Sequence, residues 1–363
     1  MINRRLAALL AVTAIVIGAC SSSATPTPAA SAAAGNCVVG VSWNNYQEER
    51  WAKWDEPAIK KALDAAGCKY ISNDAKSSSD TQLSNVDALI NQGAKVVIIL
   101  AQDGTAIKPA VKKALDAGIP VIAYDRLIED PGAFYLTFDN VLVGKLQAEA
   151  LLKVKVAGNF VVIKGNKADA NADFLRSGMV QAGLPDVGQS SDKLINVGET
   201  YTDNWDPANA QNEMAQLLTK NNNKIDIAFV ENDGMAGGVI AALKSQGLAG
   251  QVPVSGQDGD AAALNRVALG TQTVDVWKDA LLLGDATGQV AAQLAQGVAL
   301  DKVTTDKYGA SKVFDTPGGN KINSILITPQ AITKDNLQVV LDAGWIDKAT
   351  LCKDVTAGSV LGC

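Results

Sequence analysis

The sequence contains no histidine among its 363 residues. Histidine triads, histidine general bases and most zinc sites are therefore excluded together. Neither a CxxC pair nor a GxxxxGK[ST] phosphate loop is present, so a redox, metal or nucleotide-phosphate site has no support. No basic run stands out beyond the first few residues, and a formal net charge of −6 argues against a nucleic-acid partner. These absences make it less expected that the protein is an enzyme, and no cofactor is expected.

An apolar run at the N-terminus predicts export. It covers Leu6–Ile17 behind the positive segment MINRR, and it is too short to cross a hydrocarbon core of about 30 Å. Ile17-Gly18-Ala19-Cys20 is typical of a lipobox. We expect residues 1–20 to be a lipoprotein signal peptide, Cys20 to be lipidated, and residues 21–36, rich in Ser, Ala and Pro, to be a flexible linker. The alternative is an ordinary cleaved signal peptide.

Four further cysteines, Cys37, Cys68, Cys352 and Cys363, suit an oxidising compartment, where disulfides form. Cys37 opens the first predicted strand and Cys68 directly precedes the second. Strands of one βαβ unit usually lie side by side, so these two cysteines are expected to pair. Cys352 and Cys363 enclose a Gly-containing tail and are expected to form the second disulfide.

Short apolar runs alternate with helical patterns from Cys37 onward. CVVGVSW (37–43), VVIIL (96–100) and PVIAY (120–124) are separated by stretches of helical spacing. A helix over 141–156 opens a second series, which includes NFVVIKG (159–165). This alternation predicts an α/β protein with parallel sheets flanked by helices. Two successive series predict two lobes.

Polar residues follow almost every predicted strand. Asp125 and Arg126, for example, come directly after VIAY; alone they would suit an ion pair that caps a loop. Ligands of open α/β sheets bind outside the carboxyl ends of the strands, so a ring of such residues predicts a binding site. Its members are Asn44, Asn45, Arg50, Trp51, Asp125, Arg126, Asp139, Asn140, Asp169, Asn171, Asn232, Asp233, Asp258 and Lys278.

The chemistry of this ring suits a neutral polyol. Carboxylates, carboxamides, guanidinium and ammonium groups together offer paired donors and acceptors for hydroxyls. Trp51 and Trp205 add flat apolar surfaces that suit the C–H faces of a pyranose. The alternatives are that Trp51 is helix core and that Trp205 packs at the start of its helix.

Seven motifs in order carry a family resemblance: EERWAKW, AYDRLI, TFDNVLVGKLQA, ANADFLRSG, NNNKIDIAFVENDGMAGG, SGQDGD and GTQTVDVWK. Between about Gly40 and Gly344 the chain resembles the ribose- and galactose-type sugar-binding proteins of ABC importers, and among them the xylose-binding members. The resemblance implies the two-lobed periplasmic-binding-protein type 1 fold, with each lobe a parallel sheet flanked by helices. It implies a first lobe of 37–139 plus 277–319, a second of 140–276 plus 320–349, and a tail of 350–363. Three hinge crossings would lie near Asp139, Val276 and Asn320.

The resemblance also implies roles for the ring residues. Arg50 and Arg126 would donate to sugar hydroxyls and the ring oxygen, and Trp51 and Trp205 would stack on opposite sugar faces. The remaining polar ligands would be Asp125, Asp169, Asn171, Asn232, Asp258 and Lys278. Two departures bear on sugar identity: the first strand ends SWNNYQEE where more acidic residues are expected, and Trp277 stands where tyrosine is expected.

The sequence therefore predicts an exported, lipid-anchored solute-binding protein of an ABC sugar importer. It would lie at the outer face of the cytoplasmic membrane or in the periplasm, touch the membrane only through its lipid, and act as a monomer. It would bind D-xylose or D-glucose and deliver the sugar to a membrane permease and its ATPase. Alternatives are a sensor that presents the sugar to a receptor, a binder of another aldose such as galactose or arabinose, a repressor core and a glycan-active enzyme. The export signal disfavours the repressor, and carboxylates set among Arg, Asn and Lys disfavour the enzyme.

Overall fold

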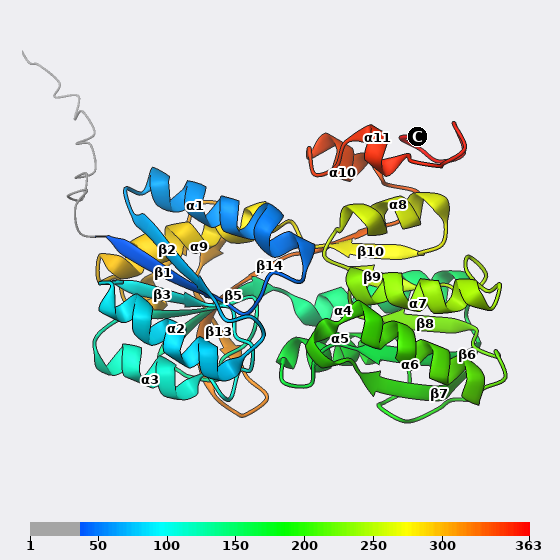
Figure 1. Ribbon diagram of the computed structural model, residues 1–363, viewed down its shortest axis with the longest axis horizontal. Helices are drawn as coiled ribbons and strands as arrows, with labels where there is room; N and C mark the ends of the chain where they lie inside the picture. The colour runs from blue at the N-terminus through cyan, green and yellow to red at the C-terminus, as the bar shows by residue number, and fades with distance from the viewer. Residues whose placement is uncertain (1–36) are drawn as a thin grey trace, which may run out of the picture. The chain divides into compact units, whose positions relative to one another are not determined.

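The computed structural model describes residues 37–363, which form two lobes built on mainly parallel sheets (Figure 1). The predicted signal peptide, Cys20 and the linker lie outside the described residues. No helix within 37–363 combines the length and the apolar character needed to span a membrane.

The first lobe contains a seven-stranded sheet in the order β13-β14-β5-β4-β3-β1-β2, in which only the β13–β14 pair is antiparallel. Its strands are β1 (Val38–Trp43), β2 (Lys69–Asp74), β3 (Val96–Ile99), β4 (Val121–Tyr124), β5 (Ala133–Phe138), β13 (Lys312–Asp315) and β14 (Lys321–Ile327). Its helices are the π-helix η1 (Trp51–Asp55), α1 (Glu56–Ala65), α2 (Ser79–Asn91), α3 (Lys108–Asp116) and α9 (Ala280–Ala295).

Helices cover both faces of this sheet. Because side chains alternate along a strand, Val96 and Ile98 of β3 pack with α1 and α9, whereas Val97 and Ile99 pack with α2 and α3. Strands buried on both faces need continuous apolar runs, which explains why the sequence predicted them correctly. Gly40 of β1 allows α2 to approach closely, since an added Cβ would lie 3.0 Å from Leu89 Cβ.

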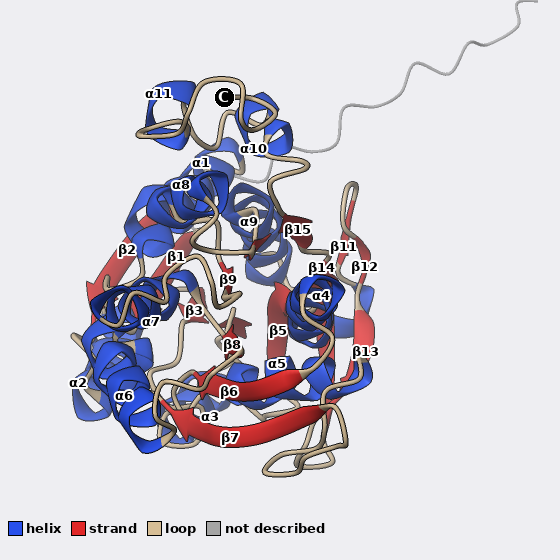
Figure 2. Ribbon diagram, turned by 90° about the vertical axis from the view of Figure 1, so that its right-hand side faces the viewer, coloured by secondary structure: helices blue, strands red, loops and turns tan. Residues whose placement is uncertain are grey.

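The second lobe holds two three-stranded sheets, β7-β6-β8 and β15-β10-β9, connected by a bridge between Ala228 and Val254. The strands are β6 (Gly158–Lys164), β7 (Leu194–Tyr201), β8 (Ile227–Val230), β9 (Ser255–Gln257), β10 (Val274–Trp277) and β15 (Gln330–Ile332). The helices are α4 (Asn140–Val154), α5 (Ala170–Gln181), α6 (Pro207–Lys220), α7 (Asp233–Ser245), α8 (Ala261–Leu269), α10 (Gln338–Asp342) and α11 (Lys348–Leu351). Apolar residues of α4 and α5 pack on one face of β6, and those of α6 and α7 pack on the other (Figure 2).

The chain passes between the lobes three times, and the third crossing differs from the expectation. The first two follow β5 and β10, as predicted. The third was expected at Asn320, but β14 pairs in parallel with β5, so residues 321–327 belong to the first lobe and the crossing comes at 328–329. Gly318 and Gly319 lie in the hairpin turn between β13 and β14, where Gly319 N–H donates to Thr316 O.

Two disulfides link the same cysteines that the sequence paired. Cys37 and Cys68 precede β1 and β2, which lie in parallel register, and their Cα atoms are 4.6 Å apart. Cys352 and Cys363 close the C-terminal tail, with Cα atoms 5.4 Å apart.

We expect replacement of both Cys37 and Cys68 by serine to lower the free energy of unfolding by about 3–4 kcal/mol, because the 31-residue separation makes loop closure in the unfolded chain costly. The disulfide between Cys352 and Cys363 closes a shorter loop. Replacing both of these cysteines by serine should therefore lower the free energy of unfolding by less. Urea denaturation measures both differences. Peptide mapping without reductant that finds free thiols or crossed pairs would contradict the assignment.

Candidate ligand-binding site

The polar residues that follow the strands converge on one cavity between the lobes. It holds about 260 Å³ of space between atoms, counted together with the solvent at its mouth. Its lining residues are Glu48, Trp51, Asp125, Arg126, Asp169, Asn171, Trp205, Asn232, Gln257, Asp258 and Lys278. Every residue to which the resemblance gave a ligand role is in this set except Arg50. The other ring residues, Asn44, Asn45, Asp139, Asn140 and Asp233, do not line the cavity. Glu48 and Gln257 are additional, although both stand beside predicted residues in the motifs EERW and SGQD.

Arg50 lies behind the cavity wall, fully buried, and joins carboxylates of both lobes. Its Nε and Nη2 donate to the two carboxylate oxygens of Asp55 at 3.0 and 2.7 Å. Its Nη1 lies 3.2 Å from Asp125 Oδ2 and 3.4 Å from Asp258 Oδ1. The π-helix η1 places Asp55 for this contact, and Tyr124 Oη also donates to Asp55. Arg50 therefore holds two cavity carboxylates in position.

Arg126 makes a second connection between the lobes at the cavity surface. Its Nε lies 3.0 Å from Asp169 Oδ2 of the second lobe, and its Nη2 donates to Glu48 Oε1 at 3.0 Å. Its Nη1 donates to Ala101 O at 3.2 Å. The planar guanidinium is thereby fixed in orientation, with its charge beside the cavity.

The loop after β4 aims Asp125 into the cavity through an unusual backbone. Asp125 has φ of 59°, a left-handed conformation that is uncommon outside glycine and is often found at functional sites. Its carbonyl oxygen accepts hydrogen bonds from Thr137 Oγ1 at 2.7 Å and from Asn171 Nδ2 at 3.2 Å. Lys278 Nζ lies 3.7 Å from the carboxylates of both Asp125 and Asp258. Side chains from both lobes thus hold this acid in place.

Two cavity residues also begin helices. Asp169 caps α5 by accepting from Asn171 N–H at 3.0 Å, and Asn232 caps α7 by accepting from Met235 N–H at 2.9 Å. A polar N-cap is needed at each position because the first amides of a helix lack partners. The capping hydrogen bond therefore fixes each side chain at the edge of the cavity. Each side chain keeps a second polar atom that can bind a ligand.

The charges in the cavity shift one another's pKa values. Burial alone would raise the pKa of Asp125, but Lys278, Arg50 and Arg126 outweigh it and hold that pKa below its usual range. Burial prevails at Asp169 and raises its pKa, although Arg126 opposes the shift. The pKa of Arg126 lies above its usual value, because Asp169 and Glu48 more than offset the burial that would lower it. Asp125 and Arg126 thus offer a charged acceptor and a charged donor to hydroxyl groups.

Trp51 and Trp205 approach the cavity from different lobes. Trp51 donates from Nε1 to Glu48 Oε2 at 2.7 Å, which orients its ring. Trp205 has φ of 57°, and its ring lies against Gly165, where an added Cβ would be 2.1 Å from the indole carbon Cζ2. Glu231 is fully buried and holds this glycine, whose N–H donates to Glu231 Oε2 at 2.7 Å. Sequence reasoning named neither Gly165 nor Glu231.

Two buried carboxyl groups, Asp233 and Asp275, hold the turn at Asp258 and Gly259. The sequence did not predict this role for either of them. Gly259 N–H lies 3.1 Å from both Asp233 Oδ2 and Asp275 Oδ1. Burial raises the pKa of Asp275 to about 8 and, with Asp275 adding repulsion, holds that of Asp233 well above its usual range. The groups that face the pair are Asp258, Asp260, Arg266 and Gln272.

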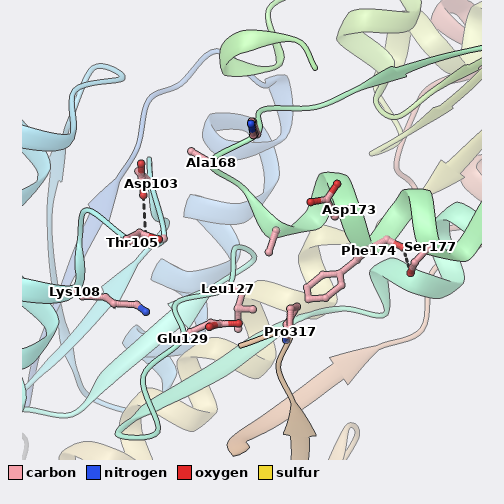
Figure 3. Close-up of a pocket in the computed structure, with 13 residues that line it drawn as sticks. Asp103, Thr105, Lys108, Leu127, Glu129, Ala168, Asp173, Phe174, Ser177 and Pro317 are labelled. Atoms are coloured by element: carbon pink, nitrogen blue, oxygen red, sulfur yellow. Dashed lines mark hydrogen bonds between the residues drawn. The ribbon is translucent and has the colours of Figure 1, made fainter. Parts of the chain in front are cut away.

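A larger cavity of about 1200 Å³ lies beside this site (Figure 3). Asp103, Lys108 and Glu129 line it from the first lobe, and Asp173 and Phe174 from α5. It lacks the converging buried ions of the smaller cavity, which therefore remains the candidate site. No cluster of possible metal ligands occurs within residues 37–363.

Stability should depend on pH through Asp275. Between the ordinary carboxyl pKa of about 4 and the folded value of about 8, the native protein keeps a proton that the unfolded chain releases. The free energy of unfolding should therefore fall as the pH rises through this range. The Asp275→Asn variant keeps an acceptor for Gly259 N–H and should lose part of this slope in urea titrations, because Asp233, whose pKa is also raised, keeps the rest. Asp315→Asn, which changes an exposed carboxylate, is the control; equal slopes in all three proteins would contradict the prediction.

Comparison with known proteins places the chain in a family. A model described as a periplasmic binding protein domain matches residues 39–299. The D-xylose-binding periplasmic protein of Escherichia coli K12 is 38% identical over 301 residues, which cover 83% of this chain and 88% of that protein. A multiple sugar-binding periplasmic receptor of Rhizobium radiobacter is 32% identical over 340 residues, with coverages of 88% and 94%.

Among solved structures, the carbohydrate transporter solute-binding protein of Chloroflexus aurantiacus in complex with D-glucose superposes with a TM-score of 0.75 at 26% identity. The match covers 86% of this chain and 97% of that one. The relatives are binding proteins and receptors rather than enzymes. Since the family model spans most of the chain and the two-lobed fold agrees with it, this chain belongs to the periplasmic binding protein family.

Proposed function

We propose that this chain is the substrate-binding protein of an ABC sugar importer and binds one D-xylose or D-glucose pyranose between its lobes. The observation that carries the proposal is the cavity between the lobes, which is lined by buried ion pairs, amides and two tryptophans. The names of the Escherichia coli and Chloroflexus aurantiacus relatives, which bind D-xylose and D-glucose, support the same ligand class.

The cavity favours a single pyranose ring. Indole rings at Trp51 and Trp205 suit a sugar whose hydroxyls are mostly equatorial, because such a ring exposes C–H groups on both faces. The hydroxyls at the ring edge would then reach Asp125, Arg126 and Asp169. A wrong epimer would leave buried ions unpaired, which costs more than one missing methylene group.

Contacts between the lobes provide a mechanism of capture by closure. Arg126 pairs with Asp169, Arg50 reaches Asp258, and Gln102 Nε2 donates to Asn204 Oδ1 at 2.8 Å. Each contact joins a residue of one lobe to a residue of the other. A sugar that binds groups of both lobes would shift an equilibrium between open and closed arrangements toward the closed one, with motion at the three crossings.

The protein would be exported, held by a lipid on Cys20, and would deliver sugar as a monomer to a membrane permease with its ATPase. A second candidate function is sugar sensing, which the name of the Rhizobium radiobacter receptor favours. Galactose and arabinose are alternative ligands.

Calorimetry against a monosaccharide panel tests the ligand. D-Xylose and D-glucose should bind well, and ribose and fructose poorly, because only the first pair presents mostly equatorial pyranose hydroxyls. Absence of heat with both pyranoses, together with tight binding of a furanose or an amino acid, would overturn the proposal.

A matched pair of variants in α5 tests whether binding takes place in this cavity. Asp169→Asn keeps the helix cap but removes the charge beside Arg126, and it should weaken sugar binding by about 30-fold, or ~2 kcal/mol. Asp173→Asn makes the same change on a side chain of the same helix that is 65% exposed, and it should leave the affinity unchanged.

Mass spectrometry of the membrane fraction tests the anchor. The mature chain should begin at a lipidated Cys20. An unmodified chain that starts elsewhere would show that export uses an ordinary signal peptide.

A further inference from the structure

Three tryptophans that do not line the cavity form a cluster where the lobes meet. Trp54 stacks on Trp345 with ring centroids 4.4 Å apart and planes inclined by 21°. Trp277 meets Trp345 edge-on at 5.4 Å. Trp54 comes from η1 in the first lobe, whereas Trp345 is buried in the apolar cluster of α8 and α10 in the second. The stacked pair therefore joins the two lobes.

Trp345 also supports the turn that presents Asp258. Its Nε1 donates to Gly259 O at 2.6 Å. Gly259 has φ of 85°, and an added Cβ would lie 2.5 Å from Trp277 Cδ1 and 3.0 Å from Trp345 Nε1. Since the backbone of Gly259 is confined in this way, the position of Trp345 fixes the backbone from which the Asp258 carboxylate reaches the cavity.

The other ring belongs to a helix that itself contacts the cavity. η1 carries Trp51, which lines the cavity, Trp54, which faces the second lobe, and Asp55, which holds Arg50. Any motion that brings Trp51 toward a ligand held by the second lobe also brings Trp54 toward Trp345. One short helix thus links ligand contact to contact between the lobes.

We propose that Trp54 and Trp345 are positioning residues that stabilise the closed lobes and orient Asp258, and that they set sugar affinity without touching the sugar. The inference rests on the proposed sugar-binding function. Because the two rings belong to different lobes, loss of the stack penalises the closed arrangement and leaves the open one unaffected. A smaller closed population raises the apparent Kd by the same factor.

Calorimetry with D-xylose and D-glucose tests the affinity. Trp54→Ala should raise the Kd by about 3- to 10-fold, in line with typical aromatic pair energies, and Trp54→Phe should recover part of the loss. Tyr308→Ala is the matched control, because Tyr308 is also half-buried but packs and donates to Asp285 within the first lobe. Its Kd should equal that of the wild type.

Small-angle X-ray scattering of the same proteins without sugar separates the two proposed roles, stabilising the closed lobes and orienting Asp258. Trp54→Ala should increase the radius of gyration, as the lobes open. Trp345→Phe keeps a stacked ring but loses the donor to Gly259 O, so it should weaken binding without opening the lobes. Wild-type affinity and dimensions in Trp54→Ala would overturn the inference. A wild-type protein that binds neither sugar would instead contradict the proposed function, and scattering would still decide whether the stack holds the lobes together.

Discussion

The candidate site depends on the cost of burying charge between two lobes. An ion withdrawn from water without a partner is strongly destabilising, so each buried charge must find an opposite charge or several hydrogen bonds. Arg50 and Arg126 meet this requirement by contacting carboxylates of both lobes at once. The same charges that a hydroxylated ligand would use are therefore the ones that hold the lobes together. Ligand recognition and lobe contact are in this sense one set of interactions.

Support for these charges lies in a layer behind the cavity. Asp55 holds Arg50, Glu231 holds the glycine beneath Trp205, and Asp233 with Asp275 holds the turn that carries Asp258. Each support is fully or almost fully buried and acts through a neighbour's backbone or guanidinium. Changes in this layer alter the geometry of the site even though these residues do not line the cavity.

The sequence predicted the residues that line the cavity better than the buried residues behind them that hold them in place. Apolar runs such as VIAY and VVIIL locate strands buried on both faces, and the carboxyl ends of those strands must share one edge, so Asp125 and Asp258 were identified. The contact of Trp54 with Trp345 joins residues almost three hundred positions apart, and no local pattern indicates it. The third crossing, which the resemblance placed at Asn320, lies later because residues 321–327 pair with β5, and no local pattern shows which strand a segment pairs with.

The disulfide between Cys37 and Cys68 determines how a pulling force at the N-terminal end of the first lobe would be distributed over its strands. Both cysteines precede parallel strands, at the edge of the sheet opposite the carboxyl ends that face the cavity. A pull on the chain at Cys37 would pass through the covalent link to a second strand as well as to β1. Tension would then be shared by two neighbouring strands in the sheet, away from the cavity opening. An attachment at this point would keep the tension away from the residues that line the cavity.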